Sequence, residues 1–227
     1  RFSDAGEMLS AWRRACLGGS APRPTPAAAG HSLPTMSFDG LGGPKADTPT
    51  RAASQLDTLE AVVRTLLLTD VVDSTAMAES LGDARMASVW LAHDRVARDL
   101  LPIHNGLEID KTDGFLLLFE DTPSAVAYAV AYHAAMRVLS AELEVRLAAR
   151  AGVHRGPVIL RENGAADVAR GAKPIEVEGL AKPTEARTMS VAGAGQTLMT
   201  SAASETLGEV DLTVRSHGHW RLKGVAL

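Results

Sequence analysis

Residues 66–75 read Leu-Leu-Leu-Thr-Asp-Val-Val-Asp-Ser-Thr, an apolar run that ends on the carboxylate of Asp70 and continues into a helix start. A second apolar run follows a carboxylate in residues 111–119, which read Lys-Thr-Asp-Gly-Phe-Leu-Leu-Leu-Phe. A continuously apolar run of strand length predicts a strand buried on both faces, so a carboxylate at its end lies at the rim of the core. Asp70 and Asp113 are therefore candidates to share metal ions.

The bulk composition favours a soluble globular protein. The chain has 227 residues and 46% apolar content, enough for one domain of about 150 to 170 residues plus a tail. Its net charge of −4 gives no electrostatic footprint for nucleic acid. No apolar run approaches the roughly 20 residues that span a bilayer, so we expect no membrane insertion. Cys16 is the only cysteine, which excludes an internal disulfide framework and favours a reducing cytoplasm.

The N-terminal quarter of the chain differs in composition from the rest. Six of the eleven prolines precede Asp57, in a stretch without a sustained apolar period. We therefore expect residues 1–57 to form a flexible or disordered tail and residues 58–227 to form the domain.

The order of predicted elements indicates an α+β fold. We expect strands at 62–71, 107–112, 115–120, 147–153 and 196–200, and helices at 74–81, 84–104 and 122–142, followed by a further helix, a short helix and a final hairpin. Asp113-Gly114 is a strong two-residue hairpin signal. Strand, helix, hairpin, helix, strand is the pattern of a ferredoxin-like sandwich, with helices on one face of a mainly antiparallel sheet. Asp70 and Asp113 would then face each other at one edge of that sheet.

The chain from Arg64 to Val225 resembles the class III nucleotidyl cyclases, the adenylate and guanylate cyclase family. Five segments are similar to the family's motifs, in its order and at roughly its spacing: 68–75 continuing into 78–83, 108–115, 150–158, 186–196 and 221–225. The phrases at 110–115 and 167–174 resemble a divergent proteobacterial subgroup linked to peptide-modification or signalling systems. That subgroup implies further C-terminal domains, and we expect the last strand of the domain to be truncated.

The resemblance implies a homodimer whose active sites each draw residues from both protomers. The implied reaction converts a nucleoside triphosphate, with ATP favoured over GTP, into a 3′,5′-cyclic nucleotide and pyrophosphate for signal transduction. Two Mg²⁺ or Mn²⁺ ions per site would bind Asp70 and Asp113, and Arg187 matches the arginine that stabilises the transition state. The substrate contacts implied are the segment Val71, Val72, Asp73, Ser74 and Thr75, whose backbone N–H groups suit a phosphate, together with Lys111, Glu176 and Lys223.

Four positions depart from the family pattern and leave alternatives open. Lys111 lies only two residues before Asp113, and Pro183 occupies the place of the asparagine that orients the ribose. Asp73 stands where many members have glycine, and we expect it to cap the following helix. Glu176 could accept from the amine of adenine, cytosine or guanine, so the base stays open. One alternative is a degenerate cyclase-like module that dimerises or binds a nucleotide, and another is a pyrimidine nucleotide cyclase.

Overall fold

The computed structural model describes residues 60–222 and 224. The tail expected at 1–57 and the predicted triphosphate contact Lys223 lie outside these residues. The strands are β1 (Ala61–Val71), β2 (Leu107–Lys111), β3 (Phe115–Phe119), β4 (Ala149–Glu162), β5 (Ile175–Glu178) and β6 (Thr197–Met199). The helices are α2 (Ser74–Leu81), α3 (Asp83–Leu100), α4 (Thr122–Glu142), α5 (Ala165–Ala169), α6 (Ala181–Val191) and α7 (Ser201–Ser204).

The central feature is a mainly antiparallel sheet of strand order β2-β3-β1-β4-β5, in which β6 adds a parallel pairing to β4. β1 lies in the middle, antiparallel to both β3 and β4. Leu66 and Leu67 are completely buried, although alternation along the strand turns their side chains to opposite faces. The α+β class and the antiparallel sheet predicted from the sequence are thereby confirmed.

Helices cover both faces of the sheet. Phe115 and Phe119 pack their rings against His93 of α3 and Tyr128 of α4 on one face. On the other face, a cluster that includes Leu66 and the alternate residues of β3 packs against α6. The expectation of helices on one face was therefore wrong for α6. A strand buried on both faces needs a second covering layer.

The boundaries of the long helices follow local signals. α2 and α4 begin and end as predicted, and the Asp121 Oδ1 accepts a hydrogen bond from the Ser124 N–H at 2.8 Å to cap α4. α3 ends at Leu100, four residues earlier than expected. The chain then turns to Asn105, whose φ of 54° is a left-handed conformation that asparagine tolerates.

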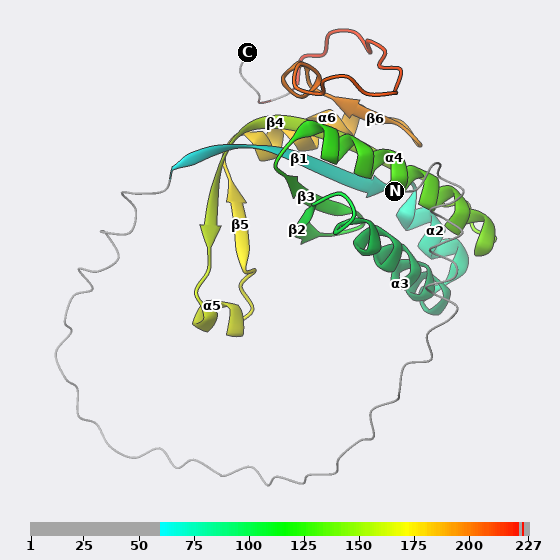
Figure 1. Ribbon diagram of the computed structural model, residues 1–227. Coiled ribbons are helices and arrows are strands. Elements are labelled where there is room, and N and C mark those ends of the chain that lie inside the picture. Colours follow the sequence, from blue (N-terminus) through cyan, green and yellow to red (C-terminus); the bar gives the residue numbers. More distant parts are fainter. Residues whose placement is uncertain (1–59, 223, 225–227) are drawn as a thin grey trace, which may run out of the picture. The chain divides into compact units, whose positions relative to one another are not determined.

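The largest difference from prediction is a long hairpin formed by β4 and β5. β4 continues to Glu162 rather than ending near Val153, and α5 lies at the end of the hairpin (Figure 1). Pro157 reads as a strand breaker, yet it lies between the part of β4 paired with β6 and the part paired with β5. A proline is tolerated where a strand has an unpaired edge. The final hairpin, expected around residues 221–225, lies partly outside the described residues, and the described residues 205–222 contain no strand.

Candidate functional site

Asp70 lies one residue from the end of β1, where the central strand reaches the edge of the core. Its register partner on β4 is Arg150. The Arg150 Nε and Nη2 lie 2.9 and 2.7 Å from the Asp70 Oδ2, so one carboxylate oxygen accepts from two guanidinium nitrogens. The Asp70 side chain is 26% exposed, which leaves the carboxylate accessible at the rim.

Asp113 lies in the turn between β2 and β3, at the same end of the sheet. The turn packs closely on β1, since a Cβ on Gly114 would lie 1.8 Å from the Thr69 carbonyl oxygen and 2.8 Å from the Asp70 nitrogen. Only glycine fits this contact. The Ser74 hydroxyl, at the start of α2, donates to the Asp113 Oδ2 at 2.6 Å. The structure thus brings together the two carboxylates that the sequence singled out.

The hairpin turn is longer than expected. It spans the three residues 112–114, with the Thr112 N–H donating to the Gly114 carbonyl at 2.9 Å, rather than the two residues of an Asp-Gly turn. A β-bulge between Glu108 and Asp110 shifts the register of β2 by one residue. The third residue of the turn is Thr112, because β2 ends at Lys111, one residue before its predicted end.

The two carboxylates fit a site for Mg²⁺ or Mn²⁺. In the described residues, no group of three or more His, Cys, Asp and Glu side chains could hold a metal by itself. Mg²⁺ is usually held by one or two carboxylates together with substrate phosphates and water. Asp70 and Asp113 therefore suit ions that arrive with a polyphosphate.

The segment that opens α2 follows directly from Asp70. Val71 is buried, and the Val72 N–H already donates to the Ala148 carbonyl at 2.9 Å, so it is not directed at a phosphate. Asp73 has a left-handed backbone with φ 58°, and its side chain caps nothing. The predicted capping role was wrong, because a cap residue has an extended backbone that aims its side chain at the helix. Ser74 and Thr75 form the first turn, whose N–H groups have no intrahelical acceptor.

Lys111, the last residue of β2, contacts side chains of α3. Its Nζ lies 3.1 Å from the Asp94 Oδ2 and 5.9 Å from the centre of the Trp90 ring. Its register partner Phe115 faces α3 as well, so Lys111 lies on the opposite face of the sheet from α6. The structure does not bring Lys111 together with Asp70.

Glu176 lies on β5, at the far end of the long hairpin. It forms an ion pair with Arg161, and the Asn163 side-chain amide donates to its Oε1 at 3.1 Å. Arg161 and Arg150 are separated by eleven residues of β4, about 35 Å of extended chain. Within one chain, Glu176 is thus remote from Asp70.

Arg187 is exposed on α6, and no side-chain partner of its guanidinium is found among the described residues. Pro183 is the third residue of this helix, a position in the first turn where proline costs no hydrogen bond. Gly152 allows α6 to approach the sheet, because a Cβ there would lie 2.5 Å from the Met189 nitrogen. α6 thereby presents Arg187 outward while its other side is pressed onto β4.

Glu185 lies on the inner side of α6 and is completely buried. Its Oε1 accepts a hydrogen bond from the Leu68 N–H at 2.9 Å, and its Oε2 has no partner. Burial raises the pKa of the Glu185 carboxyl well above its ordinary value, and the bond from Leu68 only partly opposes this. A buried, half-satisfied carboxyl group therefore ties the helix of Arg187 to the strand of Asp70.

Glu185→Gln is expected to raise the free energy of unfolding by about 1 to 3 kcal/mol at neutral pH. The unfolded carboxyl ionises near its ordinary pKa of 4.5, whereas the folded carboxyl has a raised pKa, so stability is lost as pH rises above 4.5. The gain should shrink as pH falls to about 4.5, where both states hold the proton. Urea denaturation at several pH values measures it, with exposed Glu178→Gln as the matched control. A gain that does not depend on pH would contradict the assignment.

Sequence reasoning gave no role to Arg150 or Glu185. Arg150 is one of several arginines in its strand region, and only the register of β4 against β1 pairs it with Asp70. Glu185 lies on the same helix as Arg187. Its side chain reaches the sheet because Gly152, 33 residues earlier in the sequence, leaves room for the helix. A signal for Glu185 was present, since an acidic residue two positions from Arg187 lies off the exposed stripe of a helix.

No protein-family model and no curated protein matches the sequence. Several solved structures match the fold. The guanylyl cyclase Cya2 is 22% identical over 73% of this chain and 88% of its own, with a TM-score of 0.66. The adenylyl cyclase CyaB from P. aeruginosa is 18% identical over 74% and 92%, also with a TM-score of 0.66. An adenylate cyclase from Trypanosoma brucei, solved in its monomeric state, is 24% identical over 72% and 84%, with a TM-score of 0.62.

Proposed function

This chain has the fold of the class III adenylyl and guanylyl cyclase catalytic domains, and we propose that it is itself a nucleotidyl cyclase. One observation carries the proposal. Asp70 and Asp113, from segments 43 residues apart, lie at one end of the sheet beside the start of α2 and the cation of Arg150. Two carboxylates, free backbone N–H groups and a guanidinium are together suited to a triphosphate with divalent ions.

The proposed reaction closes a ring within one nucleotide. The ribose 3′ oxygen forms a bond to the α-phosphorus, the bond from that phosphorus to the α,β-bridging oxygen breaks, and pyrophosphate leaves with that electron pair. The hydroxyl proton passes to water. Asp70 and Asp113 would hold Mg²⁺ or Mn²⁺, which would activate the hydroxyl and neutralise charge on the triphosphate. The Arg187 guanidinium stabilises the negative charge that develops on the α-phosphate oxygens in the transition state.

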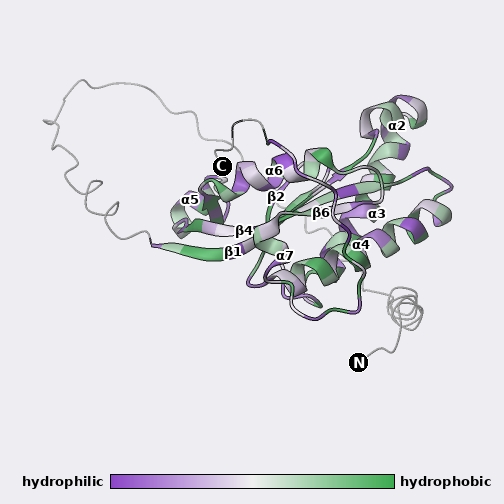
Figure 2. Ribbon diagram, turned by 90° about the horizontal axis from the view of Figure 1, so that it is seen from above, coloured by the Kyte–Doolittle hydropathy of each residue, from purple (hydrophilic) through white to green (hydrophobic). Residues whose placement is uncertain are grey.

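A second copy of the chain fits this scheme. Glu176 is too remote from Asp70 to contact the same nucleotide within one chain. Val62, Leu68, Leu160 and Ile175 are only partly buried on the face that α6 shares, and the start of β1 is coloured as hydrophobic in Figure 2. We propose that this face packs in a homodimer and brings Glu176 and Arg187 of one protomer to the metal ligands of its partner.

The experiment that tests the function is incubation of the protein with ATP, GTP, CTP and UTP in turn, each with Mn²⁺. We expect a 3′,5′-cyclic nucleotide and pyrophosphate in equal amounts from at least one of them. The four substrates also decide the base, which Glu176 does not determine, and include the pyrimidine alternative. Absence of cyclic product from all four would refute the enzyme.

Two features favour a second candidate, a module that binds nucleotide or dimerises without turnover. Lys111 is engaged by Asp94 rather than left to contact a base, and Pro183 has no side-chain polar group for the ribose. This candidate predicts nucleotide binding by calorimetry with no cyclic product. The same pair of measurements therefore separates the two functions.

Replacing Arg150 is expected to change the affinities for the triphosphate and for Mn²⁺ in opposite directions. Arg150→Gln is expected to raise KM for the triphosphate about tenfold, because a guanidinium beside the metal ligands suits a phosphate. It should also tighten Mn²⁺ binding in the absence of nucleotide, since Asp70 loses the cation 2.7 Å away. Steady-state kinetics and Mn²⁺ titration measure the two effects. A change of the same sign in both affinities would show that Arg150 only supports the fold.

In the described part of the chain, no helix has the length and apolarity that crossing a bilayer requires. The predicted subgroup and its further domains stay predictions.

A further inference from the structure

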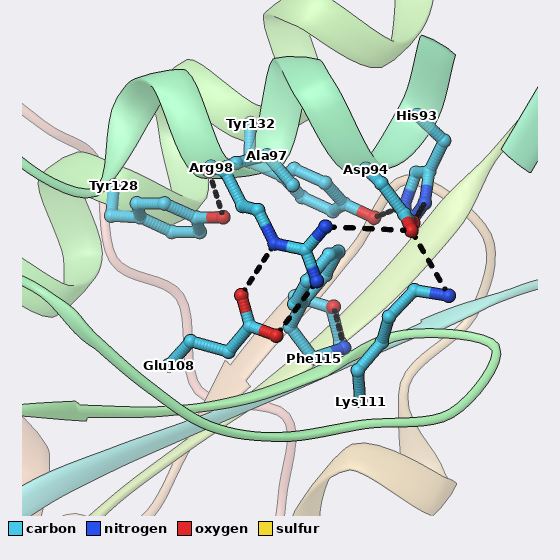
Figure 3. Close-up of polar contacts among 10 residues, drawn as sticks. His93, Asp94, Ala97, Arg98, Glu108, Lys111, Phe115, Tyr128 and Tyr132 are labelled. Carbon is cyan, nitrogen blue, oxygen red and sulfur yellow. Dashed lines mark hydrogen bonds and ion pairs between the residues drawn. The ribbon is translucent and has the colours of Figure 1, made fainter. Parts of the chain in front are cut away.

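A chain of polar contacts, buried at its Tyr132–His93 end, connects α3 and α4 to the β2–β3 hairpin. The Tyr132 hydroxyl of α4 lies 2.7 Å from the His93 Nε2, and the His93 Nδ1 lies 3.1 Å from the Asp94 Oδ1. The Asp94 Oδ2 then binds the Lys111 Nζ at 3.1 Å, at the end of β2 (Figure 3). Tyr132 and His93 are both completely buried.

The chain has one direction of donation. The Asp94 carboxylate can only accept, so the His93 Nδ1 carries the proton, and the unprotonated Nε2 accepts from the Tyr132 hydroxyl. Burial lowers the pKa of the His93 imidazole, which favours this neutral form. Within the described residues, Tyr132 is the donor to the Nε2, and solvent does not reach this bond because both side chains are completely buried.

His93 and Asp94 contact the residues at both ends of the turn that carries Asp113. Lys111 and Phe115 are the last register pair before the turn. Lys111 is held by Asp94, and the Phe115 ring lies 5.5 Å from the His93 ring, centroid to centroid. The Phe115 N–H also donates to the Thr69 hydroxyl at 2.9 Å, which fastens the turn to the strand of Asp70.

A second tether from α3 reaches the start of the hairpin. The Arg98 Nε and Nη2 donate to the two carboxylate oxygens of Glu108 at 2.7 and 2.8 Å, and the guanidinium lies 5.4 Å from the Phe115 ring centre (Figure 3). This pair is partly exposed, with the Arg98 side chain 47% accessible. Solvent weakens such a pair. The connection through His93 is less exposed, because Tyr132 and His93 are completely buried and the closing pair, Lys111 and Asp94, is 30% and 17% exposed.

We propose that the Tyr132–His93–Asp94–Lys111 chain is a positioning device, which fixes the β2–β3 turn so that the Asp113 carboxylate is preorganised for a divalent ion. The metal part of this inference rests on the proposed function, and the positioning of the turn does not. Tyr132 acts on the turn through His93, and also through its side-chain hydrogen bond with Thr69, whose hydroxyl accepts from the Phe115 N–H. Holding a ligand from behind in this way is how supporting residues set the affinity of metal sites.

The test compares two tyrosine variants that each lose one buried hydroxyl. Tyr132→Phe breaks the chain, whereas Tyr128→Phe, on the same helix and stacked on Tyr132, loses only a 3.0 Å bond to the Ala97 carbonyl. Hydrogen exchange of the hairpin amides and Mn²⁺ affinity, read by electron paramagnetic resonance without nucleotide, are measured on both. We expect Tyr132→Phe to speed exchange at residues 111–115 and to weaken Mn²⁺ binding, each about three- to tenfold, and Tyr128→Phe to change neither.

Equal hairpin exchange in Tyr132→Phe, Tyr128→Phe and wild type would overturn the proposal. If Tyr132→Phe does not fold, Lys111→Met breaks the chain at its partly exposed end and should speed exchange in the same segment. A wild-type protein that binds no Mn²⁺ would remove the metal role of Asp113 and with it the proposed function. The exchange measurement would still decide whether the chain holds the turn.

Discussion

Asp70→Asn is expected to lower turnover of the preferred triphosphate by roughly a thousandfold or more. The amide keeps the size of the side chain but loses the charge that would hold a divalent ion at the end of β1. Asparagine still accepts from Arg150, whose guanidinium lies 2.7 Å from the present carboxylate, so the fold should survive. Turnover is measured as cyclic product at saturating Mn²⁺, and folding by thermal unfolding.

The matched control for Asp70→Asn is Glu79→Gln. Glu79 is an exposed carboxylate on the neighbouring helix α2, so the substitution changes the net charge equally without touching the proposed ligands. It should keep wild-type turnover and Mn²⁺ affinity. Asp70→Asn with undiminished turnover would mean that the metal ions lie elsewhere.

Arg187→Ala should lower kcat by about a hundredfold while leaving the free energy of unfolding nearly unchanged. The side chain is exposed on α6 and no partner holds it among the described residues, so its removal costs little stability. Its proposed contact forms only as charge develops on the phosphate, and the loss should therefore be in kcat rather than in KM. Steady-state kinetics with the preferred triphosphate separate the two constants.

Arg137→Ala is the control for this second prediction. Arg137 is an exposed arginine on α4, a helix on the face of the sheet opposite α6. Its loss should affect neither constant. If Arg187→Ala instead raises KM and leaves kcat unchanged, Arg187 binds the substrate and does not act in the transition state.

The positions of the two carboxylates could be predicted because local signals determine them. An apolar run of strand length ends at Asp70, and Asp113 precedes a glycine between two other strands. Once β1 lies antiparallel beside β3, the end of β1 and the start of β3 meet at the same end of the sheet. Gly114 has a second role that the sequence does not show. It packs directly against the backbone of β1, where a Cβ atom would not fit.

The side of the sheet on which Lys111 lies could not be predicted in the same way. Glu108 and Lys111 both face α3, three positions apart, because the bulge places both Ile109 and Asp110 on the other side. Without the bulge, strict alternation would have turned Lys111 toward the face of α6. A one-residue irregularity thus decides whether this lysine meets α3 or that face.

Arg150 and the β4–β5 hairpin were missed for a related reason. The pairing of Arg150 with Asp70 depends on the register of two strands that are 80 residues apart in sequence. The hairpin depends on a strand that continues through Pro157, which local rules treat as an end. Long-range pairing overrides the local signal in both cases.

The shared active site is tested most directly by mixing the Asp70→Asn and Arg187→Ala proteins and allowing their subunits to exchange. If the metal ligands and the arginine of each site come from different protomers, half of the dimers are mixed and each has one intact site. We then expect cyclic nucleotide formation to recover to about a quarter of the wild-type rate. A mixture that forms only as much cyclic product as the average of the two variants alone would contradict it.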